Sequence, residues 1–113
     1  MHELSLTEGI LSIVSSEQKK SGFSRVLEID LRIGEYSGVI PSCIEEFFPM
    51  AAKGTAAENA RLVMNTVKAE FECRDCGFRG TPDPHTACCP TCGSTAIRMT
   101  AGREFYVENL IVE

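Results

Sequence analysis

The sequence has no tryptophan, only two tyrosines and two histidines, and it is short of basic residues. Its 11 lysines and arginines stand against 16 aspartates and glutamates, which gives a net charge of -5. A nucleic-acid-binding surface needs basic side chains to contact phosphates, so this balance argues against nucleic acid as the main partner. A chain of 113 residues is long enough for one domain, or for one small domain with a metal-stabilised subdomain.

Long apolar runs are also missing. The sequence has no stretch of 18 apolar residues, no recognisable signal peptide and no lipidation motif, and these absences predict a soluble cytoplasmic protein that does not bind a membrane. It has no nucleophile–base pair and no phosphate-binding loop, so we expect no enzymatic activity. Six cysteines without a signal peptide favour metal binding in a reducing compartment over a disulfide scaffold.

What the sequence does contain is two closely spaced cysteine pairs. The pattern is Cys73-x-x-Cys76, 12 further residues, and then Cys89-x-x-Cys92. Four thiolates at this spacing can occupy the corners of a tetrahedron, as in a structural zinc site, and a glycine after each pair permits a sharp turn. Because the protein would fill all four positions on Zn²⁺, no position is left for a water nucleophile. A rubredoxin-like iron electron carrier would use the same ligands and stays an alternative.

Apolar periodicity predicts an α+β fold. Helical spacing predicts helices over 4–20 and 42–53, and alternation or β-forming residues predict strands over 25–33, 61–71 and 105–112. The expected fold is a small three-stranded sheet with two helices, plus a zinc-ribbon-like four-cysteine module inserted before the last strand.

The same patterns predict the environment of individual residues. In the first helix, Ile13 is expected on the buried stripe together with Leu6, Ile10 and Val14. In the first strand, Leu27 is expected on the buried face together with Ile29, Leu31 and Ile33. Pro49 is expected to kink or shorten the second helix.

The amino terminus offers a second metal site. In Met1-His2-Glu3, the α-amine, the amide nitrogen of His2 and its imidazole can chelate one ion, and Glu3 can supply a further ligand through its amide or carboxylate. Planar nitrogen donors suit Ni²⁺ and Cu²⁺. An ordinary surface histidine is the alternative interpretation.

Several short segments along the whole chain resemble one known family. They are MHELSL at 1–6, RIGE at 32–35, SGV at 37–39, KGT at 53–55, ARL at 60–62, CRDCG at 73–77, CPTCGS at 89–94 and GRE at 102–104. Any one of them is common, but the ordered set is similar to the hydrogenase nickel incorporation family HypA and its relative HybF.

The resemblance implies a nickel metallochaperone. Members of the family deliver Ni²⁺ to the large subunit of [NiFe]-hydrogenase together with the GTPase HypB, and some also supply urease maturation. The match implies that His2 binds nickel with support from Met1 and Glu3, and that the four paired cysteines bind structural zinc. We divide the chain into a nickel-binding domain (1–71 with 102–113) and a zinc module (72–101). The sequence does not decide whether the chain forms a homodimer. A zinc-stabilised protein-interaction module is a further alternative function.

The chain departs from the family pattern at a few positions. Ile40 stands where many members have an acidic residue, and Asn59 stands where glycine is common. Cys43 is an additional cysteine that we expect to be buried as a small hydrophobic residue.

Two further residues lie close to the expected zinc module. Cys88 could replace Cys89 as a ligand, but the two-residue spacing favours Cys89. His85 is expected to be a solvated loop residue, with a transient nickel ligand as the alternative.

Overall fold

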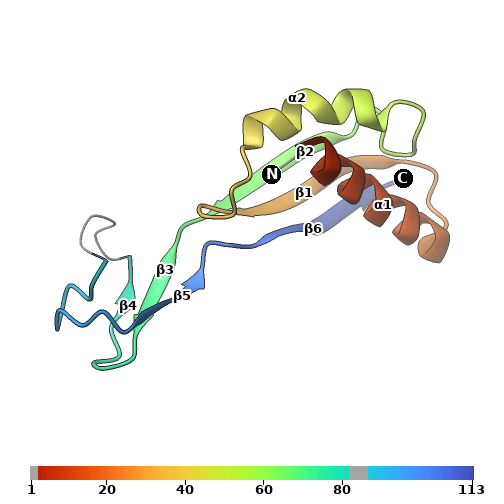
Figure 1. The fold of residues 1–113 in the computed structure, drawn as a ribbon. Helices are drawn as coiled ribbons and strands as arrows, with labels where there is room; N and C mark the ends of the chain where they lie inside the picture. The colour runs from red at the N-terminus through yellow and green to blue at the C-terminus, as the bar shows by residue number, and fades with distance from the viewer. Residues whose placement is uncertain (1–2, 82–86) are drawn as a thin grey trace.

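The computed structural model describes residues 3–81 and 87–113, with side chains from Leu4 onward. Helices and strands follow the chain in this order: α1 (Glu3–Ser21), β1 (Val26–Gly34), α2 (Pro41–Ala52), β2 (Arg61–Val67), β3 (Glu70–Cys73), β4 (Arg79–Gly80), β5 (Ile97–Ala101) and β6 (Phe105–Val112). Two helices with small sheets confirm the predicted α+β class (Figure 1).

The strands form two separate sheets. The first has the order β2-β1-β6, in which β1 is parallel to β2 and antiparallel to β6. The second has the order β4-β3-β5 and is antiparallel throughout. Figure 1 shows the two sheets in two lobes, with α1 and α2 on one face of the first sheet. The molecule is therefore elongated, with extents of 54 × 26 × 17 Å.

The parallel pair β1 and β2 is connected by α2, whose apolar side buries Ile44, Phe48 and Ala52 against the sheet. Pro41 occupies the first turn, where its missing N–H is not needed. Pro49 does not shorten the helix, which continues to Ala52. Pro49 lies on the exposed side, so water can solvate the carbonyl that lacks its helical donor.

The alternation predicted for β1 holds only in part. Ile29, Leu31 and Ile33 are buried as expected, but Leu27 is 41% exposed and Val26 is buried in its place. The pairing with β6 shifts register between Val26 and Glu28, so one extra residue reverses the side on which the preceding side chains lie. The prediction for Leu27 was therefore wrong.

The buried stripe of α1 also differs from the prediction at one position. Ile13 is 43% exposed, whereas Thr7 is fully buried. The Thr7 hydroxyl donates a hydrogen bond of 2.7 Å to the carbonyl of Leu4, which removes most of the cost of burying it. Ile10 and Val14 are buried as predicted, and Leu6 packs against the core from a half-buried position.

The single strand predicted over 61–71 is two strands in different sheets. The first sheet ends at Val67, and the second begins at Glu70 after two residues. The strands β4 and β5 were not predicted, because both are short and partner β3 through long-range pairing. The domain boundaries placed between 71 and 72 and between 101 and 102 stay a prediction.

Glycine backbone packs closely where the chain passes between the lobes. The N–H of Tyr36 donates to the carbonyl of Gly102 at 2.6 Å. A Cβ on Gly34 would collide with that carbonyl and would lie 2.7 Å from the nitrogen of Arg103. Gly102 has φ +118, and a Cβ there would lie 2.7 Å from Cα of Ala69. The loop after β1 is thus packed directly against both connections.

Two departures from the family pattern lie at local turns. Asn59 has φ 66, a conformation that glycine adopts freely and asparagine adopts more readily than most residues. Ile40 is the N-cap residue of α2, and its side chain makes no capping hydrogen bond. An acidic side chain at this position can cap the helix, whereas isoleucine cannot.

Candidate metal centre

The first cysteine pair forms a tight turn at the end of β3. The N–H of Cys73 donates to the carbonyl of Phe78 at 2.8 Å, and the N–H of Gly77 donates to the carbonyl of Cys73 at 3.1 Å. Gly77 has φ 78, so a residue with a side chain would be strained there. The turn reverses the chain from β3 into β4 and brings Cys76 beside Cys73.

The second cysteine pair repeats the same turn. The N–H of Cys89 donates to the carbonyl of Ser94, and the N–H of Gly93 donates to the carbonyl of Cys89, both at 2.8 Å. Gly93 has φ 74. The residue spacing of these hydrogen bonds is the same in both pairs, so the two turns form equivalent knuckles.

The two knuckles bring the four sulfur atoms together. The Sγ atoms of Cys73, Cys76, Cys89 and Cys92 all lie within 4.8 Å of one another, and the pairs Cys73–Cys92 and Cys76–Cys89 are 3.6 Å apart. A tetrahedral Zn²⁺ with bonds of about 2.3 Å requires sulfur atoms roughly 3.8 Å apart. A disulfide requires about 2.05 Å. The spacing therefore fits a metal ion and excludes disulfides among these four cysteines.

The surroundings of the cluster support this geometry. Cys73 and Cys89 are buried, whereas Cys76 and Cys92 are exposed, so each knuckle contributes one inner and one outer sulfur. The hydroxyl of Ser94 donates to a carboxylate oxygen of Asp75 and so connects the knuckles. The sequence prediction missed this pair, although the serine directly after the glycine of the second knuckle was a usable signal.

The four thiols do not have equal acidity. Burial opposes ionisation of Cys89, but the N–H groups of Cys92 and Thr91 and the neighbouring thiols of Cys76 and Cys92 lower its pKa to about 6. The N–H of Ser94 favours the thiolate of Cys92, but burial and the three nearby sulfurs raise the pKa of Cys92 to about 12. The thiolate of Cys89 therefore forms easily, and its negative charge opposes ionisation of the neighbouring thiols. A divalent cation removes that repulsion, so the cluster is suited to a metal ion.

The additional cysteines lie outside this cluster. Cys88 is half-buried and is not one of the four grouped cysteines, which agrees with the preference for Cys89. Cys43 is half-buried as well, so it is less buried than the sequence predicted. It lies near the start of α2, where only part of each turn faces the core.

The nickel site predicted from the sequence lies almost entirely outside the described residues. Met1, His2 and His85 are not among them, and Glu3 is described only as the first residue of α1. The nickel ligands therefore stay a prediction.

The fold and the cluster define a small α+β metal-binding protein with a four-cysteine module. A family model described as "Hydrogenase/urease nickel incorporation, metallochaperone, hypA" matches residues 1–112. The chain therefore belongs to the HypA family of hydrogenase maturation factors and nickel metallochaperones, as the sequence motifs predicted.

Relatives match over the full length of the chain. The hydrogenase maturation factor HypA of Geobacter metallireducens is 40% identical over 117 residues, and that of Acidithiobacillus ferrooxidans is 37% identical over 113 residues. Each match covers 100% of both chains.

Two solved structures share the fold. A solution structure of a HypA protein has a TM-score of 0.78 and covers 100% of this chain and 97% of the other. The Ni metallochaperone HypA from Helicobacter pylori has a TM-score of 0.71 and covers 99% and 97%. Both are 24% identical to this chain, so they support the fold alone.

Within the described residues, neither helix is both long enough and apolar enough to cross a membrane.

Proposed function

We propose that this protein is a nickel metallochaperone that binds Ni²⁺ at its amino terminus and delivers it for maturation of [NiFe]-hydrogenase. The observation that carries this proposal is the family match over residues 1–112, which includes the Met1-His2-Glu3 opening. In this function the protein acts in the cytoplasm, catalyses no reaction itself, and works with a HypB-like GTPase and the hydrogenase large subunit. Residues 1–71 with 102–113 form the nickel-binding domain.

The four-cysteine cluster is proposed to hold a structural Zn²⁺. Cys73, Cys76, Cys89 and Cys92 would be the ligands, and the sulfur separations of 3.6 Å support this assignment. The metal would supply the cross-link that holds β3, β4 and the second knuckle together, because this small lobe contains few large apolar side chains. Iron in the same site would give a red protein when oxidised, whereas zinc gives a colourless one.

The proposed nickel site suits a carrier. The α-amine of Met1 and the imidazole of His2 are nitrogen ligands that bind Ni²⁺ only when they are deprotonated. We therefore expect nickel retention to fall near and below about pH 6.5, the reference pKa of histidine. A site at the end of the chain is also easily reached by a receiving protein, so the ion can pass by ligand exchange.

The test is a Ni²⁺ titration of zinc-loaded protein with an untagged amino terminus, followed by calorimetry and visible d–d bands. His2→Ala should abolish one-to-one binding while the zinc content stays unchanged. His85→Ala is the matched control, because it removes the other of the two histidines. If His2→Ala binds nickel as well as the parent chain does, His2 is not a nickel ligand, and the zinc-stabilised interaction module becomes the better account.

Delivery needs a separate measurement. In cells that lack their own maturation factor, the parent chain should restore hydrogenase activity, whereas His2→Ala should not. Excess nickel in the medium should bypass the defect. Urease activity measured in the same cells would show whether urease is a second recipient. Restoration of hydrogenase by His2→Ala without added nickel would contradict the proposed route.

A further inference from the structure

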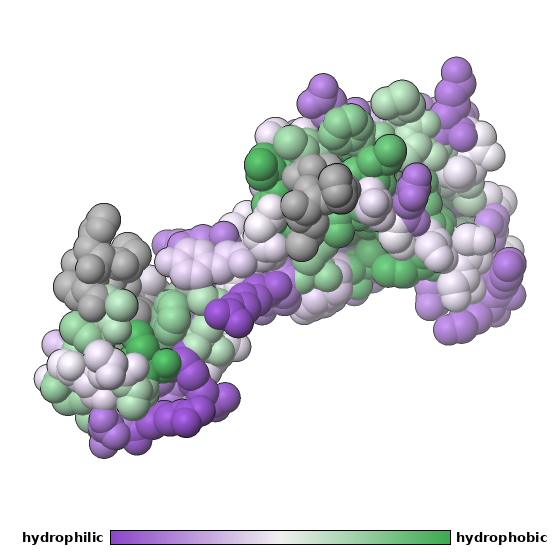
Figure 2. Space-filling model, viewed as in Figure 1, coloured by the Kyte–Doolittle hydropathy of each residue, from purple (hydrophilic) through white to green (hydrophobic). Residues whose placement is uncertain are grey.

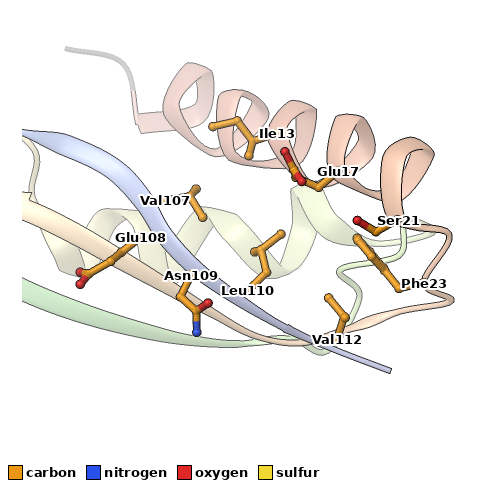
Figure 3. Close-up of a pocket in the computed structure, with 9 residues that line it drawn as sticks. All are labelled: Ile13, Glu17, Ser21, Phe23, Val107, Glu108, Asn109, Leu110 and Val112. Carbon is orange, nitrogen blue, oxygen red and sulfur yellow. The ribbon is translucent and has the colours of Figure 1, made fainter.

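A long groove runs between α1 and β6 on the larger lobe. Two adjoining cavities of about 360 Å³ and 200 Å³ form it, and both are lined by Ile13 and Val107. The first continues to Ser21 and the second to Ser5, so the groove, which we name the edge groove, follows most of α1. Figure 3 shows Ile13 pointing from α1 toward Val107 and Leu110 of β6.

The strand beside the edge groove has an open edge. In the order β2-β1-β6, no strand of the described residues lies beyond β6, which runs for eight residues. An unpaired strand edge exposes N–H and C=O groups that can pair with another extended chain. Ile111 and Val112 are 44% and 40% exposed on this strand. Figure 2 shows apolar side chains reaching the surface of the larger lobe, on the face where α1 and β6 lie.

The open edge of β6 favours an extended occupant over a helical one. Side chains on one side of an added strand would enter the groove beside Ile13 and Leu110, and side chains on the other side would lie on the open face of the sheet. A helix already uses its backbone N–H and C=O groups internally, so it could not pair with the open edge of β6. The inner side chains of the occupant should therefore be apolar and of moderate size.

Charge indicates what the outer side chains should be. Glu108 points from β6 toward the open face of the sheet (Figure 3). Its own partner is loose and exposed, at 3.8 Å to Arg32, and such a pair contributes little. Counting aspartate, glutamate, lysine and arginine, the charges of 70–103 balance, so the formal net charge of -5 comes from the rest of the chain.

We propose that the edge groove binds an extended segment of a partner protein as a fourth strand beside β6, with apolar side chains alternating with lysine or arginine. A second copy of this chain is a poorer occupant. Antiparallel pairing of two β6 strands would place two copies of Glu108 on the same face, between two chains that each carry a net charge of -5.

The test uses the full-length zinc-loaded chain without nickel, labelled with ¹⁵N. The probe is a blocked eight-residue peptide of alternating valine and lysine. Saturable shifts should appear along β6 and around Ile13, and glutamate in place of lysine should abolish them. Two further peptides carry N-methyl groups on the valines or on the lysines, so each lacks the N–H groups of one strand edge. At least one of the two methylated peptides should lose binding. If both bind as tightly as the unmethylated valine–lysine peptide, strand addition is excluded.

Variants then locate the site. Ile13→Gln should weaken binding of the valine–lysine peptide about tenfold by removing apolar contact, and Glu108→Lys about threefold by reversing the charge. Met50→Gln is the matched control, because Met50 is an apolar residue 69% exposed on the other helix, and it should bind like the parent. Unchanged ¹⁵N spectra outside the groove would show that each variant is folded.

The assignment would be overturned if the valine–lysine peptide did not bind at millimolar concentration. It would be overturned as well if the glutamate peptide bound equally, or if Ile13→Gln bound the valine–lysine peptide as tightly as the parent does. A parent chain that sediments as a dimer and becomes monomeric in Ile13→Gln would also overturn it, because the occupant would then be a second copy.

Discussion

The contact between Gly34 and the backbone of Gly102 gives the strongest test of how the two lobes are joined. The perturbation is Gly34→Ala, which adds a single Cβ. That atom would collide with the carbonyl of Gly102 and lie 2.7 Å from the nitrogen of Arg103. Both obstacles are backbone atoms, so no side chain can rotate to make room.

The expected magnitude follows from the packing. Inserting a methyl group into a filled site costs about 1–3 kcal/mol, and a site bounded by backbone belongs at the upper end. Displacing the loop would also weaken the hydrogen bond of 2.6 Å from Gly34 to the carbonyl of Glu104. We expect a loss of about 3 kcal/mol, a large share of the roughly 5–15 kcal/mol that stabilises a typical domain.

The assay is urea unfolding of the zinc-loaded protein followed by far-UV circular dichroism, with a thermal melt beside it. A loss of this size should lower Tm by about 10 °C. Gly9→Ala is the matched control, because Gly9 lies in α1 with nothing within 4 Å of its added Cβ. That variant should gain up to about 1 kcal/mol from helix propensity. A Gly34→Ala protein within about 0.5 kcal/mol of the parent would refute the packing of this loop against Gly102.

Three further predictions test local features. Ile40→Asp should raise the free energy of unfolding by about 1 kcal/mol by capping α2, whereas Ile40→Ala should give no such gain in urea unfolding. Ile29→Ala should lower the free energy of unfolding by about 2–5 kcal/mol, whereas Leu27→Ala should lower it by about 1 kcal/mol or less. The reason is that Ile29 is fully buried and Leu27 is 41% exposed. Equal losses in the two variants would contradict the register shift in β1. Cys89→Ser should lower bound zinc, measured by metal analysis after dialysis, whereas Cys88→Ser should keep one zinc per chain; the reverse result would exchange their roles.

The sequence predicted well where structure depends on neighbouring residues. The knuckles were predicted because two cysteines, two intervening residues and a following glycine specify a turn by themselves, and Gly77 and Gly93 do adopt positive φ. The last strand was predicted with its bounds, Phe105–Val112, from its β-forming residues. The positions of the two helices follow from apolar spacing and from Pro41 at the start of α2.

The errors lie where distant residues decide. Leu27 alternates correctly along its own strand, but the register shift against β6 turns it outward. Residues 61–71 read as one strand, but they separate into β2 and β3 because the first half pairs with β1 and the second with β5. Ile13 has the spacing of a core residue, yet it lies above the open edge of β6, where no further element of the described chain covers it.

The sequence by itself thus determined the types of element, the four cysteines and the motifs of the family, because each depends on residues within a few positions of one another. Only the tertiary structure decided which strands share a sheet, that the four sulfurs come within 4.8 Å, and that α1 and β6 leave a groove between them. The physical reason is that strand pairing and helix packing depend on side chains far apart in the chain, and local periodicity carries no information about their partners.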